Sequence, residues 1–69
     1  MTNGSYLKEM GGKIKAARKA NNISLRKMGE LCKTDMSNLC RLENGTVNTS
    51  ILTLKSIADV LKMDVKEFL

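Results

Sequence analysis

Four closely spaced residues, Ser37, Asn38, Cys40 and Arg41, carry side chains that can hydrogen-bond to another molecule or make a small contact with it. Ser and Asn both donate and accept hydrogen bonds, and an Arg guanidinium pairs bidentately with the edge of a guanine. The first three side chains are short, so a helix that carries them outward is slim enough to enter the major groove of duplex DNA. This segment therefore favours the recognition of base edges.

Catalytic chemistry is not expected from this sequence. It contains no His, and no Ser, Cys or Lys has an identifiable base partner that a third group orients. The carboxylates are scattered among basic residues. Cys32 and Cys40 lie eight positions apart, which is not the C-x-x-C spacing of metal sites. We therefore predict a protein that is not an enzyme and has no cofactor, no metal and no evident small-molecule ligand.

The two cysteines have different expected roles as reduced thiols. Cys32 falls on the apolar side of a predicted helix, where core packing is expected. Cys40 falls on the outer side of the next helix, and we interpret it as an inert group that fits against a base methyl or a phosphate. The alternative is a redox sensor, because nearby positive charge activates a thiol and Arg41 is adjacent.

Short amphipathic helices are predicted to position these residues. Apolar residues recur at steps of three and four, and Ser24, Asp35 and Ser50 stand where helix N-caps are expected. Asp64 with Glu67 resembles a capping box, and no alternating strand pattern occurs. The sequence therefore predicts an all-α, five-helix fold without a sheet, with helices at Tyr6–Asn21, Leu25–Cys32, Met36–Asn44, Ile51–Leu61 and Val65–Phe68.

The apolar stripes of these helices identify the expected core. Two short helices joined by a tight turn also need a small residue where they approach each other, and Gly29 fills that place. The residues expected to face inward are Leu7, Met10, Ile14, Ala17, Leu25, Met28, Leu31, Cys32, Leu39, Leu42, Leu54, Ile57, Ala58, Leu61, Val65, Phe68 and Leu69.

Length and charge narrow the class further. A chain of 69 residues forms one domain, expected at 6–69, with residues 1–5 as a flexible N-terminus that is no signal peptide. No apolar run approaches the roughly 18 residues of a membrane span, so a cytoplasmic location is expected. The formal net charge of +5 favours a polyanionic partner, although a lysine-rich surface can also be merely solvated.

Residues 10–69 resemble the Xre/Cro family of lambda-repressor-like helix-turn-helix DNA-binding domains. The stretches that carry the resemblance are IKAAR at 14–18, ISLRKMG at 23–29, SNLCRLENG at 37–45 and LKSIADVL at 54–61. The resemblance implies a compact domain whose helix-turn-helix motif spans about 25–44. It also implies sequence-specific binding of double-stranded DNA by a transcriptional regulator, a repressor of bacterial or mobile-element origin.

The resemblance also implies roles for individual residues. The reading helix would begin with Asp35, Met36 and Ser37, while Asn44 and the segment 24–27 would lie against phosphates. Arg18 and Glu43 would form a structural ion pair. The complete set of expected DNA-binding residues is Ser24, Leu25, Arg26, Lys27, Thr34, Asp35, Met36, Ser37, Asn38, Cys40, Arg41, Asn44 and Thr46.

Four positions depart from the family's pattern. Leu25 stands where Gln often braces the reading helix, and Thr49 stands where Pro is frequent. Lys33 occupies the turn position that is usually Gly, which costs about 1–2 kcal/mol if its φ is positive. Met36 cannot donate a hydrogen bond but can touch a thymine methyl.

A homodimer on an inverted-repeat operator is the expected assembly. One reading helix reaches few base pairs, and a small module buries only about 600–1,000 Å² against DNA. The terminal pair Phe68-Leu69 either folds back onto the core or meets a partner, and Val47 and Ile51 are further apolar candidates for that surface. The alternative function is a protein-interaction module, such as an antitoxin that binds a partner protein.

Overall fold

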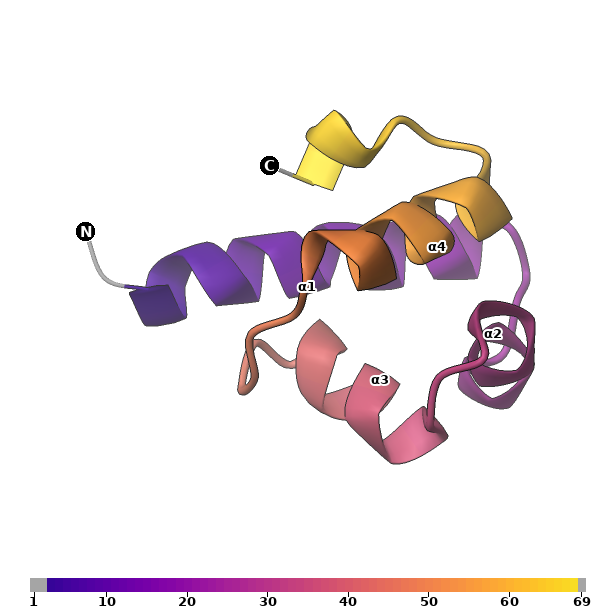
Figure 1. Ribbon diagram of the computed structural model, residues 1–69, viewed down its shortest axis with the longest axis horizontal. Helices are drawn as coiled ribbons and strands as arrows, with labels where there is room; N and C mark the ends of the chain where they lie inside the picture. Colours follow the sequence, from indigo (N-terminus) through magenta and orange to yellow (C-terminus); the bar gives the residue numbers. More distant parts are fainter. Residues whose placement is uncertain (1–2, 69) are drawn as a thin grey trace.

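The computed structural model describes residues 3–68, and the side chains from residue 6 onward, as an all-α domain (Figure 1). Its elements are α1 (Asn3–Ala20), α2 (Leu25–Cys32), α3 (Met36–Glu43), α4 (Ile51–Leu61) and a 3-10 helix, η1 (Val65–Phe68). The described residues contain no strand. The predicted fold class is therefore confirmed.

Three predicted helices differ in detail from those observed. The first spans Asn3–Ala20 rather than Tyr6–Asn21, and the third ends at Glu43 rather than Asn44. Met1, Thr2 and Leu69 lie outside the described residues. The fifth element has the predicted bounds but is a 3-10 helix. Four residues allow little more than one tight turn, closed here by the Glu67 amide donating to the Asp64 carbonyl at 3.0 Å.

The helices surround a single aliphatic core. Figure 1 shows α1 and α4 running across the middle, η1 on one side of them, and α2 and α3 on the other. Leu31, expected inside, is 46% exposed, because the buried arc of α2 is centred on Met28, Gly29 and Cys32 and does not extend to it. The buried apolar residues are Met10, Ile14, Met28, Cys32, Leu39, Leu42, Leu54, Ile57, Ala58, Leu61 and Phe68.

Side-chain caps begin two of the helices as expected. Ser24 Oγ accepts from the Lys27 amide at 3.0 Å, and Ser50 Oγ accepts from the Thr53 amide at 3.2 Å. Each such bond satisfies an amide that the first helical turn leaves unpaired. Asp35 occupies the N-cap of α3 in an extended conformation but makes no capping hydrogen bond with its side chain. Its carboxylate is exposed.

A left-handed residue makes the turn between α2 and α3 tight. Lys33 has φ 56°, and the amide of Thr34 reaches back to the Gly29 carbonyl at 2.9 Å. A Cβ on Gly29 would lie 2.8 Å from the Thr34 carbonyl oxygen, so this close return requires glycine at position 29. The prediction that Gly29 permits the approach of the two segments is confirmed.

Lys33→Gly is expected to raise the free energy of unfolding by about 0.5–1 kcal/mol. A left-handed conformation strains a residue that has a Cβ, and this relief outweighs the greater freedom that glycine has in the unfolded chain. Urea unfolding of the variant measures the change. Lys33→Ala is the matched control, because it keeps the Cβ and should gain little. Equal stability of the two variants would contradict the prediction.

Candidate nucleic-acid interface

The side of α3 that faces away from the core carries six exposed side chains. We call this set the α3 outer face: Met36, Ser37, Asn38, Cys40, Arg41 and Asn44. Leu39, Leu42 and Glu43 are buried on the opposite side. In Figure 1 α3 lies at the lower edge of the domain, with no other element beyond it. The helix is therefore held by the core along one side and is free along the other.

The first turn of α2 carries a second group of expected contacts. Ser24, Arg26 and Lys27 are exposed, and the N-terminal amides of a helix favour an anion such as phosphate. Lys27 Nζ lies 3.9 Å from Glu30 Oε1, but both side chains are about 60% exposed, so this pair is weak. Leu25 is half-buried and packs against the core, so it offers less free surface than its neighbours.

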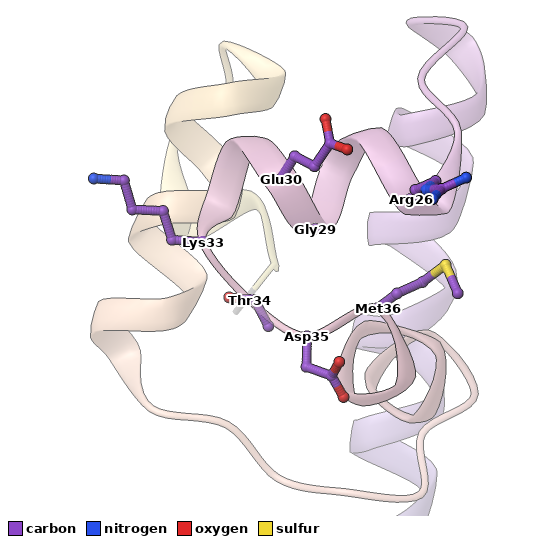
Figure 2. A pocket seen from close by; sticks show the side chains of 7 residues that line it. All are labelled: Arg26, Gly29, Glu30, Lys33, Thr34, Asp35 and Met36. Carbon is purple, nitrogen blue, oxygen red and sulfur yellow. The ribbon is translucent and has the colours of Figure 1, made fainter.

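An open groove of about 440 Å³ lies between α2 and the start of α3 (Figure 2). Figure 2 shows Arg26 and Met36 extending to the same side of the motif, while Lys33 extends to the opposite side. Both signs of charge line the groove, which gives it no net preference for an anion. Its lining residues are Arg26, Gly29, Glu30, Lys33, Thr34, Asp35 and Met36.

The sequence reasoning left three of these lining residues out of the candidate site. Positions 26, 29 and 30 follow the i, i+3, i+4 spacing of one helix face, so Gly29 and Glu30 share a face with Arg26, whereas Lys33 joins the lining through its left-handed turn. That spacing was the available signal. The side of α2 that faces the start of α3 therefore adjoins the side that α2 buries, with Gly29 belonging to both.

A buried ion pair fixes the end of α3. Arg18 Nε lies 2.6 Å from Glu43 Oε2 and Nη2 lies 3.1 Å from Oε1, which gives the bidentate geometry of a strong pair. Nη1 donates to the Ile23 carbonyl at 2.8 Å, so the same guanidinium also holds the α1–α2 connection. The hydrogen bond to Glu43 raises the pKa of Arg18, and the arginine stays charged.

Close contact between backbones supports the same junction. A Cβ on Gly11 would clash with the carbonyl groups of Leu42 and Glu43, so α1 can approach the end of α3 this closely only with glycine there. Each residue of the ion pair is 8% exposed. The ion pair and this close backbone contact thus hold the end of α3, and with it the α3 outer face, against α1.

The two threonines in the expected set already use their hydroxyl groups. Thr34 Oγ1 donates to the Cys32 carbonyl at 3.2 Å, and Thr46 Oγ1 donates to the Arg41 carbonyl at 3.1 Å. These hydroxyls can still accept a hydrogen bond but no longer donate one freely. Thr34 lies at the start of the α3 outer face and Thr46 lies beyond its end, so they flank it.

The two cysteines occupy different environments. Cys32 is buried in the core, and desolvation raises the pKa of its thiol. Cys40 is exposed on α3, and Asn44 Nδ2 approaches its sulfur at 3.7 Å. The residues that the structure describes contain no cluster of His, Cys, Asp and Glu that could hold a metal ion. None of their helices is long and apolar enough to cross a membrane.

Known proteins share this architecture. A family model described as HTH_3: Helix-turn-helix matches residues 14–68. The structure of the restriction-modification controller protein C.AhdI from Aeromonas hydrophila is similar, with a TM-score of 0.87 and 24% identity over 91% of this chain and 96% of that chain. A comparison with curated proteins finds no match.

Two further solved structures have the same arrangement of helices. The clp gene regulator ClgR from Corynebacterium glutamicum has a TM-score of 0.87 and 22% identity, over 91% of this chain and 67% of that one. An HTH_3 family transcriptional regulator from Vibrio cholerae has a TM-score of 0.88 and 25% identity, over 97% of this chain and 38% of that one. The fold described above thus recurs at low sequence identity.

Proposed function

We propose that this chain binds double-stranded DNA sequence-specifically and represses transcription, because it belongs to the helix-turn-helix family HTH_3, the Xre and lambda-repressor-like group. The observation that carries the proposal is the α3 outer face. Most of its exposed side chains can form hydrogen bonds with another molecule. The core and the Arg18–Glu43 pair anchor the opposite, buried side of the helix. Such a helix fits the major groove, where base edges differ in their donors and acceptors.

The contacts divide into two kinds under this proposal. Ser37, Asn38 and Arg41 reach base edges and supply specificity, while Asn44 and the first turn of α2 lie against phosphates and set the orientation of the domain. Repression follows from occupancy, because a domain of 32 × 24 × 21 Å bound over a promoter excludes other proteins from the same groove. The family relationship and the net charge of +5 support this assignment.

The salt dependence of DNA affinity tests the proposed function. An operator is first selected from a random duplex library, and its affinity is then measured over a range of salt concentrations. We expect log affinity to fall with log salt at a slope of about −0.9 per phosphate neutralised. Weak retention that is equal for all sequences would contradict sequence-specific binding and would favour a protein partner instead.

We further propose that two copies bind an inverted repeat. Phe68 is 1% exposed and packs into the core. For Phe68, the structure therefore favours folding back onto the core over contact with a partner. Leu69 lies outside the described residues. The most exposed large apolar side chains lie at the start of α4, where Ile51 is 56% exposed and Leu52 is 74% exposed, with Val47 half-buried nearby in sequence. Leu52 was absent from the sequence-based candidates.

The dimensions of the domain suit this assembly. Its longest extent is 32 Å, close to the roughly 34–36 Å between half-sites one helical turn apart. Sedimentation with a palindromic operator duplex is expected to show two copies per duplex. Replacing Ile51 and Leu52 together by serine should reduce this to one, whereas Leu31→Ser, at another exposed leucine, on α2, should not. A one-to-one complex at saturating wild-type protein would contradict the proposal.

A further inference from the structure

Two side chains on the α3 outer face differ in chemistry from the other four. Met36 cannot donate a hydrogen bond, and Cys40 donates only weakly. They lie four positions apart on α3, so one stands above the other on the helix surface. Met36 is 47% exposed and Cys40 is also exposed. We call this pair the sulfur row.

Asn44 contacts the sulfur of Cys40. It lies four positions further along the same ridge, and its Nδ2 donates to Cys40 Sγ at 3.7 Å. Because the sulfur already accepts this hydrogen bond, the surface that it leaves for another molecule is mainly polarizable and only weakly polar. None of the described residues makes such a hydrogen bond to Met36, and Figure 2 shows Met36 extending away from the start of α3 on the same side as Arg26. The sulfur row is therefore an exposed apolar strip within a hydrogen-bonding face.

One group on the base edges complements such a strip. In the major groove the apolar substituent that a base pair displays is the 5-methyl group of thymine. Four helical positions span about 6 Å along the axis, which corresponds to about two base-pair steps of roughly 3.4 Å. The sulfur row is therefore long enough to contact methyl groups on neighbouring base pairs.

We infer that Met36 and Cys40 determine part of the operator sequence by contacting thymine methyl groups, one or two in each half-site. This inference rests on the proposed DNA-binding function and adds to it the kind of base that this flank of α3 selects. Hydrogen-bonding side chains on the same face, such as Ser37 and Arg41, then read the adjoining base pairs.

Deoxyuridine substitution in the selected operator tests the inference. Uracil keeps every hydrogen-bonding group of thymine and lacks only the 5-methyl group, so each thymine of one half-site is replaced in turn. Affinity is expected to fall about fourfold at one or two positions, the effect of withdrawing one buried methyl-sized group. Met36→Ala and Cys40→Ser should each reduce the penalty at one position to less than about 1.5-fold.

Leu31→Ala is the matched control, because the 46% exposure of Leu31 is close to the 47% exposure of Met36, but Leu31 belongs to α2. It should leave the uracil penalties unchanged, and circular dichroism verifies that every variant is folded. The inference is overturned if no thymine in the operator shows a penalty, or if the penalties persist undiminished in both α3 variants; specific binding would then remain and the proposed function would stand. Failure to select any operator would instead overturn the proposed function and this inference together.

Discussion

Glu43→Ala is expected to lower the free energy of unfolding by about 3–5 kcal/mol, because it leaves the Arg18 guanidinium buried without its partner. Both side chains are at most 10% exposed, so water cannot replace the lost carboxylate. A chain of 69 residues has a total free energy of unfolding on the order of 3–10 kcal/mol. The variant should therefore lose a large fraction of its stability, which urea unfolding followed by circular dichroism would measure.

The double variant Arg18→Met with Glu43→Leu removes both charges, whereas Glu43→Ala leaves one buried charge unpaired. Comparing their free energies of unfolding therefore separates these two effects. Apolar side chains of similar size satisfy a buried site about as well as an ion pair does, so the double variant should be more stable than Glu43→Ala alone. Asp59→Ala is the exposed control: Lys55 Nζ and Asp59 Oδ2 are 3.7 Å apart, but both side chains are about two-thirds exposed. It should cost less than about 1 kcal/mol. Similar losses for Glu43→Ala and Asp59→Ala would show that burial adds nothing to the pair.

Local rules were enough to predict most of the fold. Ser24 and Ser50 could be predicted as helix caps because a cap depends on hydrogen bonds within a few residues. The 3.6-residue period located the core side of α3 and α4 for the same reason. The Arg18–Glu43 contact spans 25 positions, and only the family resemblance pointed to it.

The features that sequence reasoning missed depend on tertiary packing. Leu31 belongs to the apolar pattern of α2 but is exposed, because an eight-residue helix buries a narrow arc and the turn at Lys33 fixes which arc it is. The groove between α2 and α3 likewise exists only once the turn has set the two helices against each other.

Arg41→Ala is expected to weaken binding to the selected operator by about 1–3 kcal/mol, or roughly 5–150-fold, and to relax base preference at one pair. Arg41 is exposed in the last turn of α3, and none of the described acidic side chains forms an ion pair with it. Its backbone is fixed, because the carbonyl accepts hydrogen bonds from both the amide and the hydroxyl of Thr46. A long cation on a fixed backbone suits bidentate pairing with guanine.

Lys27→Ala is the control for charge alone. Lys27 is exposed in the first turn of α2, where a phosphate contact is proposed, so its loss should weaken all duplexes about equally and reduce the salt slope by about 1. Binding to the operator, to every single-base variant of one half-site and to random duplex is measured for both proteins. Arg41→Ala should flatten the preference at one position and leave the others intact, because a bidentate contact addresses one base pair. If both substitutions lower operator and random-duplex affinity by the same factor, Arg41 reads no base and contributes charge only.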